Sequence, residues 1–155
     1  MFFSKLSFSR LGASLMLAGS ALLASTVAQA ADFVSIKNDT VNIRAQASTN
    51  SDILWKLTQG YPLQVEQKQG DWFKVRDFED TLGWVYAPLV TNSPHRVIKV
   101  KVANLRGGPG TNHNVVAKME QYEVVRTLGS KNDWVQIQRS NGQKGWIAAN
   151  LTWGW

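Results

Sequence analysis

Two stretches of the chain match each other at a constant offset of 62 residues, and this internal repeat constrains the fold more than any other feature. Residues 36–90 align with residues 98–152 without a gap, and 14 of the 55 aligned pairs are identical. A gapless match of this density predicts two duplicated modules of about 60 residues, each just large enough to fold alone. The identical pairs include Asn42 with Asn104, Arg44 with Arg106, Asp71-Trp72 with Asp133-Trp134, and Gly83-Trp84 with Gly145-Trp146.

The first 30 residues have the pattern of a secretory signal peptide. Lys5 and Arg10 supply positive charge, residues 11–23 form an uncharged apolar run, and residues 28–30 are Ala-Gln-Ala, a small-x-small cleavage pattern. The apolar run is shorter than the about 20 residues that a membrane-spanning helix needs. We therefore expect a helical signal peptide over residues 1–30, cleavage after Ala30, no stable membrane span afterwards, and a periplasmic or secreted location. An uncleaved N-terminal anchor is the alternative.

The mature chain would carry a modest excess of positive charge and no cysteine. Removal of residues 1–30 leaves 15 Lys and Arg against 11 Asp and Glu, a net charge of +4. Without cysteine the modules must hold by core packing, and thiol nucleophiles and thiolate metal ligands are excluded. The basic excess favours an anionic partner such as a wall polymer, or simply provides solubility. Export argues against nucleic acid as the partner.

The sequence predicts an all-β fold throughout the mature chain. Short runs rich in β-branched and aromatic residues, such as residues 41–44, 72–76 and 83–86, alternate with turn residues, and Asn141-Gly142 is the strongest hairpin signal. Strands at this spacing indicate a small barrel or sandwich in each module. We expect one domain over residues 31–90, a short linker over residues 91–95, and a second domain over residues 96–155, joined as a semi-rigid tandem.

Each module contains the same short motifs in the same order. Residues 41–44 are Val-Asn-Ile-Arg, and residues 103–110 are Ala-Asn-Leu-Arg-Gly-Gly-Pro-Gly. An Asp-Trp pair and a closing Gly-Trp-Val or Gly-Trp-Ile follow in each module. This pattern resembles the bacterial SH3-like domain over nearly all of residues 33–152. The resemblance implies two tandem five-stranded small β-barrels that bind rather than catalyse, because such domains target wall hydrolases to peptidoglycan or bind peptides. The first module has Gln46-Ala47-Ser48 in place of Gly-Pro-Gly, which weakens any claim that both loops bind the same ligand.

Strand alternation separates a core face from a more polar face in each module. In residues 72–76, Phe73 and Val75 point one way, and Trp72 points the other way with the basic side chains. The polar face would then hold an aromatic shelf for a sugar or peptide. The alternative is that these tryptophans are packing material in a tightly curved barrel. The candidate aromatic ligand-binding residues are Trp72, Trp84, Tyr86, Trp134 and Trp146.

Two arginines and two glycines recur at the ends of strands. Arg44 and Arg106 could each bind a carboxylate of the ligand with two hydrogen bonds. The alternative, which we favour, is that each guanidinium is tied to loop carbonyls or stacked on a barrel tryptophan. Gly83 and Gly145 are expected to permit a tight bend where a strand enters the barrel.

No arrangement of residues in the sequence predicts catalysis. His95 and His113 have no counterpart across the repeat, and Asp71 and Asp133 precede strands at turns, where capping explains them. We therefore expect no catalytic residue, no metal and no cofactor. The predicted function is an exported, non-catalytic module that binds peptidoglycan or wall peptides in the bacterial envelope. The alternative is an envelope adaptor that binds a protein partner or peptide.

Overall fold

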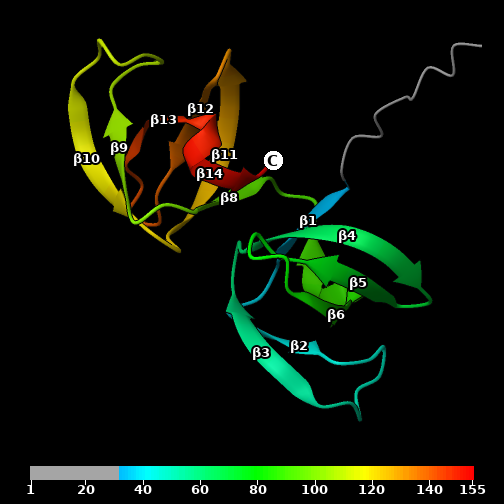
Figure 1. Ribbon diagram of the computed structural model, residues 1–155. Helices are drawn as coiled ribbons and strands as arrows, with labels where there is room; N and C mark the ends of the chain where they lie inside the picture. The colour runs from blue at the N-terminus through cyan, green and yellow to red at the C-terminus, as the bar shows by residue number, and fades with distance from the viewer. Residues whose placement is uncertain (1–31) are drawn as a thin grey trace, which may run out of the picture.

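The structure is a computed structural model that describes residues 32–155, and these residues form two antiparallel sheets of seven strands each (Figure 1). The predicted signal peptide and its cleavage site at Ala30 lie outside the described residues. Within residues 32–155, none of the helical segments has the length and apolar character needed to cross a bilayer.

The first module has the strand order β3-β2-β6-β5-β4-β1-β7. Strands β2 to β6 make the five-stranded antiparallel arrangement that was expected. Two further strands, β1 and the short β7, extend the sheet beyond β4. The elements are β1 (Phe33–Ile36), β2 (Thr40–Arg44), β3 (Ile53–Thr58), β4 (Pro62–Gln69), β5 (Trp72–Arg76), β6 (Leu82–Tyr86), the 3-10 helix η1 (Ala87–Leu89) and β7 (Val90–Thr91).

The second module repeats this topology as β10-β9-β13-β12-β11-β8-β14. The predicted Asn-Gly turn joins β12 to β13, and Gly142 has a φ of +86°, in the left-handed region that such turns require. The elements are β8 (His95–Ile98), β9 (Val102–Arg106), β10 (Val115–Glu120), β11 (Val124–Lys131), β12 (Trp134–Gln138), β13 (Lys144–Ala148), the 3-10 helix η2 (Ala149–Leu151) and β14 (Thr152–Gly154).

The core residues follow the alternation that the sequence predicted. Val75 and Ile137 are fully buried at equivalent positions of β5 and β12, and Val85 and Ile147 are fully buried on β6 and β13. Each is a β-branched residue on one face of a strand, where it packs well against its neighbours across the sheet. Trp72, Trp84, Trp134 and Trp146, on the opposite faces of these strands, are half-buried.

Gly83 and Gly145 allow neighbouring strands to pack closely. A Cβ atom on Gly145 would lie 2.6 Å from Leu105 Cγ and 2.9 Å from the carbonyl oxygen of Arg106, and one on Gly83 would collide with Ile43. Neither glycine has a positive φ. The missing side chain is what lets β6 and β13 approach the neighbouring strand, and the bend expected at these glycines stays a prediction.

The two modules share a packed interface. The alternating residues Val97 and Ile98 on β8 serve different cores, because Val97 belongs to the core cluster of the first module and Ile98 to that of the second. Trp153 on β14 also packs on the first core, with its ring 5.0 Å from that of Phe33 in an edge-on arrangement. Trp155 stacks on the same Phe33 ring at 5.6 Å. Figure 1 shows β8 and β14 side by side, next to the first module.

A second contact between the modules involves an unusual backbone conformation. Tyr122 has a φ of +69°, in the left-handed region where the equivalent residue of the first module is Gly60, with a φ of +81°. A tyrosine adopts this conformation only at a cost. Its side chain explains why it is there, because the ring lies 5.7 Å from that of Phe78 and its hydroxyl donates a 2.9 Å hydrogen bond to Glu79.

Candidate functional site

A shallow groove on the second module brings together two of the residues that the sequence singled out. Trp134 on β12 and Arg106 at the end of β9 line a hollow of about 210 Å³, which is smaller than the about 300–1,000 Å³ of sites that enclose a small molecule. The groove therefore has the size of a subsite for one side chain or one sugar ring. Its other lining residues are Val102, Ala103, Asn104, Thr111, Ala148 and Leu151.

The equivalent surface of the first module is occupied by an aromatic side chain. Tyr86 lies directly across from Trp72 in the β5–β6 ladder, with the two ring centroids 5.5 Å apart. Across the repeat, Tyr86 corresponds to Ala148, which pairs with Trp134. Replacement of a tyrosine by an alanine leaves the face of the second-module tryptophan open, so this surface is a groove in the second module and an aromatic shelf in the first.

Arg44 and Arg106 make hydrogen bonds to loop carbonyls. Arg44 Nη1 donates to the carbonyl of Ser51 at 2.7 Å, and Arg106 Nη1 donates to the carbonyls of Thr111 and His113 at 3.1 and 2.9 Å. These bonds hold the loop that follows each strand in a fixed shape. Arg106 therefore shapes the groove that it lines, with its positive charge at the rim.

Trp84 on β6 and Trp146 on β13 lie one strand away from Trp72 on β5 and Trp134 on β12. In the ladders, Trp84 pairs with Lys74 and Arg44, and Trp146 pairs with Gln136 and Arg106. They share the outer face with Trp72 and Trp134. Trp146 is absent from the lining of the groove, so the residues brought together there are Arg106 and Trp134.

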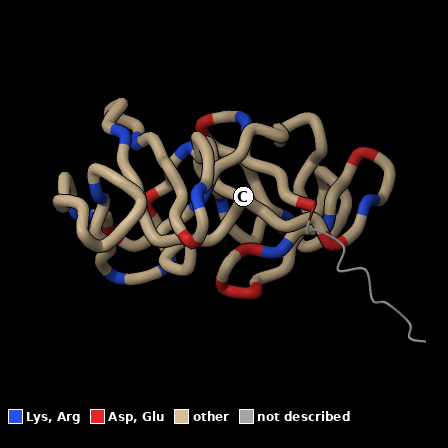
Figure 2. The backbone as a smooth tube through the Cα atoms, turned by 90° about the horizontal axis from the view of Figure 1, so that it is seen from above, with Lys and Arg blue, Asp and Glu red and all other residues tan. Residues whose placement is uncertain are grey.

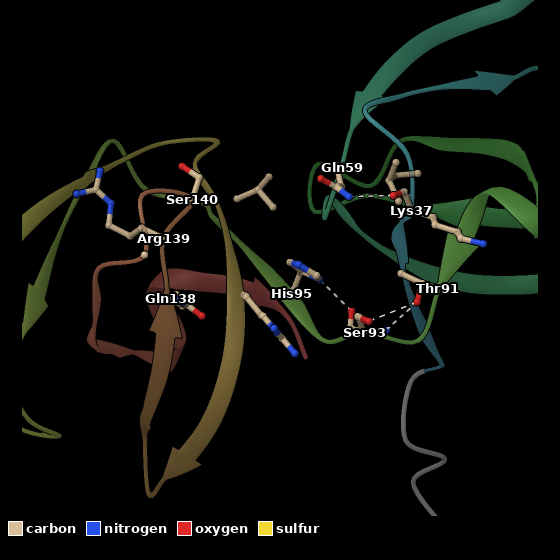
Figure 3. Close-up of a pocket in the computed structure, with 12 residues that line it drawn as sticks. Lys37, Gln59, Thr91, Ser93, His95, Gln138, Arg139 and Ser140 are labelled. Carbon is tan, nitrogen blue, oxygen red and sulfur yellow. Dashed lines mark hydrogen bonds between the residues drawn. The ribbon is translucent and has the colours of Figure 1, made fainter.

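Sequence reasoning missed a larger cleft, which lies between the two modules and measures about 510 Å³ (Figure 3). Gln59 lines it from the first module, and Gln138 and Ser140 line it from the second. Ser93 and His95, the first residue of β8, line it as well, and His95 lies between the two walls. The repeat could not reveal this cleft, because comparison within modules says nothing about the surface between them.

Positive charge is concentrated in the second module. Residues 95–155 contain nine Lys and Arg against three Asp and Glu, a net charge of +6, whereas residues 32–94 contain six against eight, a net charge of −2. Figure 2 shows that basic segments are spread over the second module and that most acidic segments belong to the first. The modest overall charge therefore conceals one strongly basic module.

Comparison with known protein families assigns both modules to one class of domain. Models described as "Bacterial SH3 domain" match residues 37–92 and residues 101–152. These two matches together cover most of the chain and agree with the all-β topology. The chain belongs to the bacterial SH3 domain family, as a tandem pair, and the resemblance seen in the sequence is confirmed.

The relatives of known description are larger proteins. The chain is 23% identical over 137 residues to "Putative N-acetylmuramoyl-L-alanine amidase YrvJ" of Bacillus subtilis (strain 168), and the match covers 77% of this chain and 26% of that protein. Among solved structures, NlpC2 of Trichomonas vaginalis is 13% identical, with a TM-score of 0.38 over 81% of this chain and 48% of that one. An NlpC/P60 family protein of Bacillus cereus ATCC 10987 is 16% identical, with a TM-score of 0.37 over 80% and 56%. The chain spans about a quarter of the amidase's length.

Residues that could hold a metal do not gather in the described part of the chain. No group of three or more His, Asp or Glu side chains is placed to share an ion within residues 32–155. His95 lies in the cleft between the modules, where its Nδ1 donates a 3.0 Å hydrogen bond to the carbonyl of Ser93, and His113 lies against Gly108 in the loop beside the groove.

Proposed function

We propose that the chain is an exported, non-catalytic binding protein that attaches to peptidoglycan or its peptides in the bacterial envelope. The observation that carries this proposal is the groove of the second module, in which the open face of Trp134 lies beside Arg106 on a module of net charge +6. An indole face accepts a sugar ring or an apolar side chain by stacking. The positive surroundings attract the carboxylates of wall peptides.

The family and its relatives support this assignment. Bacterial SH3 domains make up both modules, and one relative is described as a putative N-acetylmuramoyl-L-alanine amidase. The predicted signal peptide fits an envelope location. The shelf of the first module, with Trp72 and Tyr86, would add a second, weaker contact, and two linked contacts raise the overall affinity.

Co-sedimentation of the full chain with purified sacculi tests both parts of the proposal. We expect the protein to pellet with the sacculi, and we expect no soluble wall fragments to appear in the supernatant after prolonged incubation. Release of fragments would contradict the non-catalytic assignment. A protein that stays in the supernatant would contradict wall binding and favour an adaptor that binds a protein partner.

A further inference from the structure

The cleft between the modules is a preformed cavity of a size that suits a small ligand. Its volume of about 510 Å³ lies within the about 300–1,000 Å³ that is usual for small-molecule sites. Residues from both modules and from the linker contribute to it, so it exists only in the tandem. The lining residues that matter for the argument are Gln59, Ser93, His95, Arg126, Gln138 and Ser140.

Hydrogen bonds hold the linker side of the cleft in place. The carbonyl of Ser93 accepts bonds from Ser35 Oγ at 2.9 Å and from His95 Nδ1 at 3.0 Å. On the same, first-module side of the cleft, Gln59 Nε2 donates to the carbonyl of Lys37 at 3.1 Å. Figure 3 shows His95 between the two walls. A site that is already ordered loses little conformational entropy when a ligand binds.

The charge of the cleft wall is reversed across the repeat. Four residues of the second module that line the cleft carry a net charge of +2, and their counterparts in the first module carry −1. In the first module Arg76 is paired with Glu66 and Asp80, so that its charge is compensated. The four equivalent pairs are Gln64 with Arg126, Arg76 with Gln138, Asp77 with Arg139, and Asp80 with Gly142.

One cation of this wall lacks a counter-charge. Arg139 pairs with Glu123 at 2.7 Å, and in Figure 3 the charged ends of Arg139 and Lys37 extend away from His95. Arg126 is exposed and forms no ion pair with any residue in the range 32–155. The lining contains no carboxylate, and it offers amide and hydroxyl groups beside Arg126. This combination suits an anionic ligand that also has polar groups to bond.

We propose that the cleft is a second ligand site, which binds a carboxylate of a wall peptide through Arg126, with Gln59, Gln138 and Ser140 bonding the polar groups around it. A guanidinium group pairs well with a carboxylate because its planar donors match both oxygens. The proposal rests on the proposed function, and it adds a composite site that needs both modules. The two sites lie on different surfaces, so each can be followed separately.

An NMR titration of the full chain with a soluble disaccharide-tetrapeptide fragment of the wall tests the proposal. Backbone amide signals of Ser140 and Gly142 report on the cleft, and the indole signal of Trp134 reports on the groove. Arg126→Gln installs the residue that the first module has at this position, so the variant should fold. We expect it to weaken the cleft titration by about tenfold or more, as for loss of a charge-assisted hydrogen bond, and to leave the groove titration unchanged.

Controls separate this site from general charge effects and from the proposed function itself. Lys118→Gln removes the same charge from an exposed position on β10, and it should leave the cleft titration unchanged. A fragment whose carboxylates are converted to amides should bind the cleft of the wild type no more tightly than it binds the cleft of Arg126→Gln. The cleft proposal would be overturned if the groove signals respond but the cleft signals of the wild type do not change. It would also be overturned if Arg126→Gln and Lys118→Gln affect the cleft titration equally. If neither the cleft signals nor the groove signals change on titration, both proposals would be overturned.

Discussion

The residue that lies across from the repeated tryptophan, Tyr86 in the first module and Ala148 in the second, decides how the surface beside that tryptophan is used. The first module has Tyr86 there, packed against Trp72, and the second has Ala148, which leaves Trp134 open. We therefore predict that Ala148→Tyr closes the groove and lowers the affinity for sacculi by about tenfold, comparable to loss of a binding hot spot. The thermal midpoint should change little, because the first module already accommodates this tyrosine. Unchanged binding by a folded Ala148→Tyr variant would rule out the groove.

Tyr61 makes stability depend on alkaline pH. Burial raises the pKa of Tyr61 well above its ordinary value of 10.0, and the nearby carboxylates of Asp77 and Glu79 add to the shift. Above about pH 10 the unfolded chain loses this proton and the folded chain keeps it, so stability is complete below that pH and falls as the pH rises. We predict that Tyr61→Phe flattens this loss in chemical denaturation series between about pH 9 and 11. The exposed Tyr86→Phe is the matched control, and equal slopes for the two variants would contradict the assignment.

At the scale of single strands, the close approach of β13 to β9 depends on Gly145. We predict that Gly145→Ala lowers the free energy of unfolding by about 1–3 kcal/mol, as expected when a methyl group is forced into a packed site. Gly129→Ala on β11 is the matched control, because a Cβ atom there meets nothing within 4 Å and the residue has no positive φ. Denaturant titration measures both. Similar stabilities for the two variants would mean that β13 can shift away at no cost.

Most strands of each module could be predicted because their signals are local. Alternation of apolar and polar residues placed Val75 and Ile137 in the cores and the tryptophans on the outer faces, and turn residues such as Asn141-Gly142 fixed the hairpins. Strands β3 and β10 were not among the predicted strands. The two-residue strand β7 and the three-residue β14 were not predicted either, because such short segments carry no period of their own. β7 and β14 are strands only because β1 and β8 offer them an edge to pair with.

The candidate site could be predicted only in part, for a similar reason. The repeat pointed to Trp134 and Arg106, which do line one groove. It gave no reason to favour the second module, since that depends on Ala148, a position where the repeat differs. The cleft residues, such as Arg126 and Ser93, also lie at positions that differ between the modules or precede the second repeat unit. Identity across the repeat emphasises what both modules share and therefore hides what only one of them does.

At the scale of the whole molecule, the aromatic tail couples the two modules. Trp153 packs on the first core and against Phe33, so the modules should unfold together. We predict that Trp153→Ala separates unfolding into two transitions and costs somewhat less than the about 3–5 kcal/mol of a fully buried aromatic, since this side chain is partly exposed. Differential scanning calorimetry distinguishes one transition from two. Tyr86→Ala is the control, because it removes an aromatic side chain away from the interface and should keep the single transition. If Trp153→Ala also unfolds in a single transition, the modules are coupled by other contacts.

The central claim is that the groove of the second module binds the wall by stacking, aided by charge. Its most direct test is the affinity of the full chain for purified sacculi across a salt series, measured for the wild type, Trp134→Ala and the equivalent Trp72→Ala. We predict that Trp134→Ala weakens binding by at least about tenfold at every salt concentration, that Trp72→Ala weakens it less, and that salt weakens the wild type only partly. Equal binding by the wild type and a folded Trp134→Ala variant, with all retention lost at high salt, would contradict the claim.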